Sequence, residues 1–233
     1  MLISHQQPAP VINIAHRGYH RDFPENTMEA FRAALALGVD GIEFDVQETA
    51  DGQFFVYHND DISGQKIAGM PASKIRAIRL QGKYGIPSLQ EVLELCGSSL
   101  ILLVEVKQVK SLDNFLKIIR SCTNISHIVI VSFDQVLIAQ LAKLAPDIMR
   151  AVITDAPAAN TEEITKGVGS AAIGMRCPDA NAGAVESMHE EGTMVFVWGC
   201  QDAQSVRRVL GLPIDGIISD FPDIVKEYNA ARS

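Results

Sequence analysis

The sequence lacks the features that mark several large classes of protein. It contains no Cys-x-x-Cys pair, no cluster of Lys and Arg, and no run of about 18 apolar residues that would span a membrane. Its first residues carry neither the basic start nor the long apolar stretch of a signal peptide. The formal net charge is −8, whereas a general nucleic-acid surface needs clustered basic residues. We therefore expect a cytoplasmic protein without a nucleic-acid partner or stable membrane insertion.

The sequence also shows no linker that would separate two domains. No Pro/Gly/Ser-rich tract, charge block or low-complexity run divides the 233 residues, and 47% hydrophobic residues suffice for a substantial core. The cysteines lie in apolar contexts that are typical of small core residues in a reduced protein: Cys96, Cys122, Cys177 and Cys200. We expect one domain over residues 1–233, and its oligomeric state is left open.

Short β-branched runs alternate with amphipathic stretches along the chain. The expected strand and helix pairs are 11–15 with 28–37, 41–46 with 89–96, 101–106 with 112–119, 127–132 with 135–144, 149–153 with 162–167, 171–175 with 182–190, 194–198 with 203–210, and 216–219 with 222–228. Eight such units predict a closed (β/α)₈ barrel, the TIM-barrel fold. A doubly wound open sheet produces the same alternation and is the alternative.

Two local features add detail to this pattern. Asn26 is expected to cap the first helix, with Glu29 completing a capping box and Gly38 ending the helix. The polar segment 59–86, which contains several glycines and Pro71, breaks the alternation. We interpret it as a short excursion after the second strand, over the barrel mouth.

Charged residues stand on one face of two predicted strands. Because residues two apart on a strand face the same side, Glu43 and Asp45 converge, and Glu105 and Lys107 do the same on the third barrel strand. A Glu–Lys pair on one strand alone is often a structural ion pair. Three carboxylates on two strands instead favour a hard divalent cation, Mg²⁺ or Ca²⁺.

Two histidines end strand-like runs near these carboxylates. His16 closes the first strand and is followed by Arg17 and Gly18, and His58 closes the run 54–58. A single histidine at a strand end is often only hydrogen-bonded, but two of them beside a metal site provide a base and an acid for a phosphodiester reaction. Arg17 and Lys107 would then stabilise the charged phosphoryl oxygens.

The motifs occur in a fixed order: His16-Arg17-Gly18, Pro24-Glu25-Asn26-Thr27, Glu43-x-Asp45, His58, Ile86-Pro87-Ser88-Leu89, Glu105-x-Lys107, Trp198 and the run 215–222. This set resembles the signatures of the glycerophosphodiester phosphodiesterases, a metal-dependent family with a PI-phospholipase-C-like barrel. The resemblance implies a (β/α)₈ fold, a divalent metal held at Glu43, Asp45 and Glu105, and acid/base catalysis by His16 and His58. It also implies a small-molecule glycerophosphodiester substrate, hydrolysed to glycerol 3-phosphate and an alcohol.

The roles of other residues stay open at this level. Glu25 either interacts with the dipole of the first helix or orients Arg17. Trp198 either fills the core or forms an apolar wall for the glycerol or alcohol group. The remaining histidines have no partner in the pattern and are interpreted as structural or surface residues: His5, His20, His127 and His189.

The sequence departs from the family pattern after His58, where Asn59-Asp60-Asp61 replaces the usual Asp and Arg-Thr-Thr stretch. This departure leaves the orientation of His58 open. The sequence also leaves open the preferred alcohol and the choice between Mg²⁺ and Ca²⁺.

Two alternatives to the hydrolase hypothesis remain. One is a phospholipase D-like enzyme acting on lysophospholipids, which an exposed apolar rim would favour. The other is a barrel that binds metal and phosphate without turnover, which would not need two proton-transfer groups.

Overall fold

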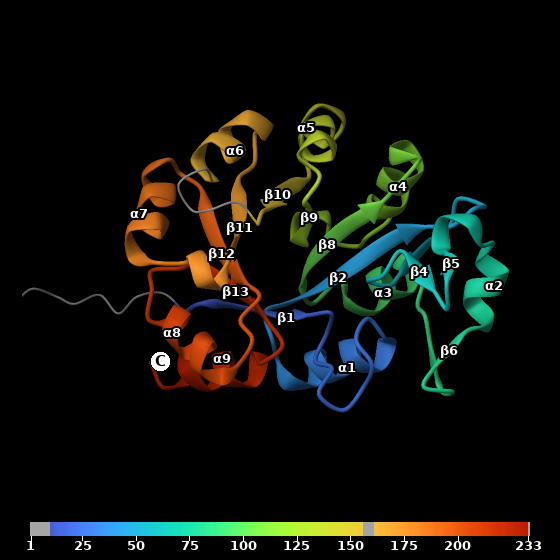
Figure 1. Ribbon diagram of the computed structural model, residues 1–233, viewed down its shortest axis with the longest axis horizontal. Coiled ribbons are helices and arrows are strands. Elements are labelled where there is room, and N and C mark those ends of the chain that lie inside the picture. The colour runs from blue at the N-terminus through green and yellow to red at the C-terminus, as the bar shows by residue number, and fades with distance from the viewer. Residues whose placement is uncertain (1–9, 156–160, 233) are drawn as a thin grey trace, which may run out of the picture.

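The runs predicted as strands join into one closed parallel barrel, seen in the computed structural model, which describes residues 10–155 and 161–232 (Figure 1). Neighbouring barrel strands follow chain order, and the first strand pairs with both the last and the second, which closes the ring. The eight strands are β1 (Ile12–His16), β2 (Gly41–Glu48), β8 (Ile101–Gln108), β9 (Ile128–Ser132), β10 (Met149–Ile153), β11 (Ala172–Arg176), β12 (Met194–Trp198) and β13 (Gly216–Ser219). The predicted single-domain TIM barrel is confirmed, and the open sheet is excluded.

Helices surround this barrel on its outer side (Figure 1). They are α1 (Met28–Leu37), α3 (Leu89–Cys96), α4 (Leu112–Ile119), α5 (Gln135–Leu144), α6 (Thr161–Val168), α7 (Ala182–Glu190), α8 (Ala203–Leu210) and α9 (Pro222–Ala230). Strand residues alternate between two cores, as the period of two requires. Leu102 and Val104 join the large core between strands and helices, whereas Leu103 joins the core inside the barrel. The next inward-facing residue on β8 is Glu105.

The start of α1 differs from the expectation. Thr27 is the N-cap, and its side chain accepts a hydrogen bond from the backbone N–H of Ala30. Asn26 is not the cap, and the expected capping box with Glu29 does not form, because Asn26 has a left-handed φ of 57° and turns its side chain towards β2. The expected end is confirmed: Gly38 adopts a left-handed conformation with φ 77° and caps the helix.

The segment 59–86 forms a small insertion of short strands and one short helix beside the end of β2 (Figure 1). It follows β3 (Phe54–Val56), which pairs antiparallel with β2, and contains β4 (Asp61–Ile62), β5 (Gln65–Lys66), the 3₁₀ turn η1 (Ile67–Gly69), α2 (Ala72–Ala77), β6 (Arg79–Leu80) and β7 (Tyr84–Gly85). The carbonyl of Met70 accepts from Ala50 N, and that of Ala68 accepts from Lys110 Nζ. These contacts place the segment at the rim near β2 and β8, and its covering of the mouth stays a prediction.

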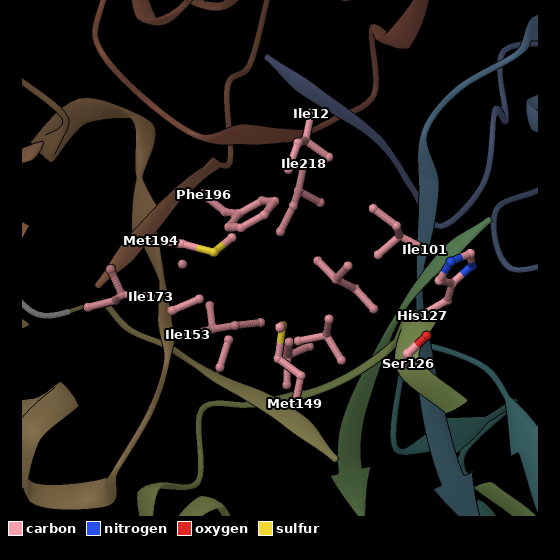
Figure 2. A pocket seen from close by; sticks show the side chains of 16 residues that line it. Ile12, Ile101, Ser126, His127, Met149, Ile153, Ile173, Met194, Phe196 and Ile218 are labelled. Carbon is pink, nitrogen blue, oxygen red and sulfur yellow. The ribbon is translucent and has the colours of Figure 1, made fainter. Parts of the chain in front are cut away.

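The barrel interior is hollow at its amino-terminal end. Figure 2 looks into a cavity of about 250 Å³ whose lining includes the first residues of several strands, such as Ile12, Ile101, Met149 and Met194. Ser126 and His127 are the polar side chains in the lining. Because it offers no cluster of charged or metal-binding groups, this cavity is not the place of the chemistry predicted above.

Across residues 10–155 and 161–232, no helix combines the length and the apolar character needed to cross a membrane.

Close packing around Gly41, at the amino-terminal end of the barrel, predicts that a larger residue there lowers the stability of the protein. A methyl group at Gly41 would lie 2.5 Å from the carbonyl oxygen of Ile101 and 2.6 Å from Cδ1 of Ile14. We expect Gly41→Ala to lower the free energy of unfolding by about 1–3 kcal/mol because backbone and core must shift. Urea denaturation measures this. Gly85→Ala is the control, since no described residue, its chain neighbours aside, lies within 4 Å of its added carbon. Equal stability of the two variants would contradict the prediction.

Candidate active site

Three buried carboxylates meet near the carboxyl-terminal end of the barrel. Glu43 and Asp45 project from β2, and Glu105 projects from β8, where its Cα is paired with that of Asp45. Their exposed fractions are 2%, 0% and 6%, and one oxygen of each lies within 4.8 Å of the others. The strand periodicity that predicted their convergence is therefore confirmed in space.

Burial of this cluster penalises its negative charge. Burial raises the pKa of Glu43 well above its usual value, and the charges of Asp45 and Glu105 raise it further. Burial and Asp45 likewise raise the pKa of Glu105, whereas Lys107 and His58 act in the opposite direction. Oε1 of Glu43 is buried and has no hydrogen-bond partner among the residues that the structure describes. Three oxygen donors that repel one another fit a divalent cation, so the cluster is a potential metal site.

Two basic side chains border the carboxylates. Lys107 forms ion pairs with Glu105 and with Oδ1 of Asp45, the latter at 3.1 Å. Nε of Arg17 lies 3.3 Å from Oδ2 of Asp45. Although burial lowers the pKa of Lys107, Asp45 and Glu105 raise it above its usual value, so its side chain stays an ammonium. Both cations are partly exposed at the site, where an anionic substrate group can reach them.

The Arg17 side chain is held by Glu25. Nη1 of Arg17 donates to Oε1 of Glu25 at 2.8 Å, and the backbone N–H of Arg17 donates to Glu43 at 3.1 Å. Of the two roles considered for Glu25, this geometry favours orienting Arg17. Gly18 allows α1 to pack closely: its φ is 81°, and a side-chain carbon added there would lie 2.9 Å from the backbone of Ala30.

One nitrogen of the His16 ring faces the carboxylates, and the other is held by Asp220. Nδ1 of His16 lies 2.6 Å from Oδ1 of Asp220, and Nε2 lies 3.9 Å from Oε2 of Glu43. Because a carboxylate only accepts, the neutral ring carries its proton on Nδ1 and directs the Nε2 lone pair to the site. The hydrogen bonds from His16 and from His20 hold the pKa of Asp220 well below its usual range, although burial raises it.

His58 lies close enough to Glu105 to lower the pKa of that carboxyl group electrostatically. Nδ1 of His58 lies 2.9 Å from the side-chain oxygen of Asn59, which orients the ring in the same way. The unusual residue after His58 therefore supplies its partner. Gln47 also donates to the backbone carbonyls of Tyr57 and His58, at 3.0 and 3.2 Å, which holds the His58 loop against β2.

Aromatic residues form one wall of the mouth. Trp198, the last residue of β12, donates from Nε1 to the carbonyl of Gly174 at 3.1 Å and packs edge-to-face on Phe133, with ring centroids 5.4 Å apart. Phe133 directly follows β9 and is 40% exposed, and Nζ of Lys107 lies 5.8 Å from its ring centroid. Trp198 is therefore partly buried yet continuous with an apolar surface beside Lys107, which favours its role as a wall.

Sequence reasoning missed several side chains of the site. Asn26 donates to Oδ2 of Asp45 at 2.8 Å and is buried. Asp220 and Phe133 were not singled out, and His20 was dismissed although Nε2 of His20 lies 3.1 Å from Asp220. Asn26 and Asp220 lie within the ordered sequence motifs, and that position was the sign of a role in the site. No sequence motif points to Phe133.

His127 and His189, also outside the pattern, lie away from this site. His189 is paired with Asp215 at 2.8 Å, directly before β13 begins, and His127 borders the amino-terminal cavity. His5 lies outside the described residues. The expected structural roles of His127 and His189 thus agree with their positions.

Comparisons with known proteins identify the family of this chain. The model of the glycerophosphoryl diester phosphodiesterase family matches residues 16–224. The chain is 27% identical over 228 residues to a glycerophosphodiester phosphodiesterase of Caldanaerobacter subterraneus, covering 90% of this chain and 94% of that protein.

Solved structures share the fold. The glycerophosphodiester phosphodiesterase of Thermotoga maritima matches with a TM-score of 0.80 and 27% identity, covering 94% of this chain and 99% of that one. A phosphodiesterase of Oleispira antarctica, determined with its product sn-glycerol-3-phosphate, matches with a TM-score of 0.83 and 21% identity, covering 94% and 96%.

Proposed function

The chain belongs to the glycerophosphoryl diester phosphodiesterase family, and we propose on that premise that it hydrolyses glycerophosphodiesters to glycerol 3-phosphate and an alcohol. It is a phosphoric diester hydrolase whose substrate is a small molecule. The observation that carries this function is the meeting of three buried carboxylates with His16 and His58, each ring oriented by its own partner.

Glu43, Asp45 and Glu105 would hold Mg²⁺ or Ca²⁺, both of which prefer oxygen ligands. When bound, the ion supplies positive charge that polarises the phosphoryl group. Asn26 and Arg17 hold Asp45 from the other side, and the backbone N–H of Arg17 holds Glu43. These contacts keep the carboxylates in place while the substrate binds and leaves.

The other side chains around the carboxylates bind the substrate and transfer protons. Arg17 and Lys107 bind the phosphoryl oxygens, and Phe133 with Trp198 packs against the apolar part of the substrate. One histidine accepts the proton of the attacking hydroxyl group, and the other gives a proton to the alcohol oxygen as its bond to phosphorus breaks. In the mechanism that the family resemblance implies, the glycerol 2-hydroxyl attacks first, and water then opens the cyclic phosphate with the histidine roles exchanged.

One observation favours a second candidate, a phospholipase D-like activity on lysophospholipids. Phe133 and Val136 are 40% and 67% exposed, and Phe133 directly precedes the N-cap of α5 beside the mouth. Such a rim can receive an acyl chain. The same metal and histidines would serve, so the two candidates differ in substrate and not in chemistry. The non-catalytic barrel has less support, because Nε2 of His16 lies 3.9 Å from Glu43 and each histidine ring is held by a partner of its own.

Turnover on two substrates distinguishes these functions. Metal-depleted protein is supplied with Mg²⁺ or Ca²⁺ and given glycerophosphocholine or lysophosphatidylcholine, and choline release is measured. We expect release from glycerophosphocholine only when metal is present, and more slowly from the lysolipid. Faster release from the lysolipid would establish the second candidate. No release from either substrate would favour the barrel that binds metal and phosphate without turnover. The cytoplasmic location and the absence of a nucleic-acid partner stay predictions.

A further inference from the structure

A second cluster of metal-binding atoms lies behind His16, on the side away from the carboxylates. Nδ1 of His16, Nε2 of His20 and Oδ1 of Asp220 all lie within 4.8 Å of one another. His16 ends β1, His20 lies in the loop before α1, and Asp220 directly follows β13. Both rings therefore point at one carboxylate oxygen, at 2.6 and 3.1 Å.

The dimensions of this cluster suit a small tetrahedral ion. Zinc binds imidazole nitrogen and carboxylate oxygen at about 2.0–2.2 Å, so its ligand atoms stand roughly 3.4 Å apart in a tetrahedron. The two separations from Asp220, 2.6 and 3.1 Å, are both shorter than that value, and all three atoms lie within 4.8 Å of one another, so small side-chain rotations would admit the ion. The Asp220 side chain is 44% exposed, which leaves the fourth position open to water.

Ligand chemistry separates the two clusters. Glu43, Asp45 and Glu105 offer oxygen alone, which Mg²⁺ and Ca²⁺ prefer, whereas two imidazoles and one carboxylate suit Zn²⁺. An excess of Mg²⁺ should therefore occupy the carboxylates without competing strongly at the histidines. His16 and His20 lie close together in the sequence, and the pairing of β1 with β13 that closes the barrel brings Asp220 to them.

We propose that His16, His20 and Asp220 form an inhibitory zinc site. Zinc bound there would take the lone pair of Nδ1 of His16, so the single ring proton would move to Nε2 and the hydrogen bond to Asp220 would be lost. The ring would then lack both the Nε2 lone pair and the carboxylate support that its proton transfer needs. The inhibition rests on the proposed role of His16 in turnover, whereas the zinc site itself does not.

Direct binding tests the site independently of activity. The full-length protein, saturated with Mg²⁺ and with its cysteines reduced, is titrated with Zn²⁺ against a chromophoric zinc indicator. We expect His20→Gln to weaken binding of one zinc ion by at least about tenfold, the range seen when metal-site residues are lost. His189→Gln is the matched control, because it removes a histidine paired with one aspartate elsewhere in the barrel. Equal zinc binding by wild type and His20→Gln would overturn the proposal.

Inhibition is then measured on glycerophosphocholine with Mg²⁺ present. Relative to its own rate without zinc, His20→Gln should need at least about tenfold more zinc than wild type for half inhibition. Equal sensitivity would overturn the inhibitory role and place the zinc effect elsewhere, such as at the carboxylates. If zinc binding depends on His20 but the wild type does not hydrolyse the substrate, the proposed function fails and the zinc site stands.

Discussion

Glu43→Gln is expected to remove most of the turnover, by about 100-fold or more, and yet to make the metal-depleted protein more stable at neutral pH. The first effect follows because a metal site with one ligand charge fewer binds the cation less tightly. The second follows because Glu43 is a buried carboxylate beside two others, which raises its pKa. Glutamine has nearly the same shape and carries no charge to repel Asp45 and Glu105.

The pH dependence gives the sign of this stability effect. A carboxyl group with a raised pKa binds a proton in the folded protein at a pH where the unfolded chain, with a pKa near ~4.3, has released it. The free energy of unfolding that Glu43 contributes therefore falls as the pH rises above that value. Wild type and Glu43→Gln should be similarly stable near pH ~4, and Glu43→Gln should be the more stable of the two near pH ~8.

Urea denaturation of chelator-treated proteins at several pH values measures this difference. The matched control is Glu48→Gln on the same strand, because the buried Glu48 carboxylate accepts from the backbone N–H groups of Lys110 and Ser111. That variant should be less stable than wild type and should still be stabilised by Mg²⁺, whereas Glu43→Gln should respond little to Mg²⁺. Full turnover without metal, or a loss of stability in Glu43→Gln near pH ~8, would contradict the prediction.

His16→Ala and His58→Ala are expected to respond differently to the leaving group. Choline leaves poorly without a proton, whereas nitrophenolate leaves readily on its own, so loss of the general acid should matter much less on a nitrophenyl glycerophosphodiester. Asp220 stabilises positive charge on the His16 ring after it accepts a proton, whereas His58 has the neutral Asn59 as its partner. We therefore expect His16 to be the base and His58 the acid in the first step.

Each variant should lose about 10²- to 10⁴-fold on glycerophosphocholine, the usual contribution of a positioned proton-transfer group. On the nitrophenyl substrate, His58→Ala should recover most of its rate and His16→Ala should not. Asp220→Asn is the control for the assignment, because it weakens the base and should slow both substrates alike. Recovery of His16→Ala instead would exchange the two roles, and equal losses everywhere would show that neither histidine is the acid.

Much of the site followed from local sequence because strand periodicity is a local property. The apolar alternation of Leu102 and Val104 fixed the face on which Glu105 lies, and the same period brought Glu43 and Asp45 together. The strand and helix ranges were predicted closely, since each covers a few residues whose side chains alternate or repeat within one window. The start of α1 was missed because Asn26 and Thr27 both suit an N-cap, and only a neighbouring strand decides between them.

The sequence by itself determined the eight units, the inward face of the carboxylates and, through ordered motifs, the family. Tertiary structure alone decided which side chains complete the site. The His16–Asp220 contact spans 204 residues, because β1 and β13 pair only when the barrel closes. The contacts of Phe133 with Trp198, of Asn26 with Asp45 and of His20 with Asp220 also join different elements. Local patterns encode burial and direction, whereas these contacts depend on barrel closure, strand register and the paths of the loops between strands.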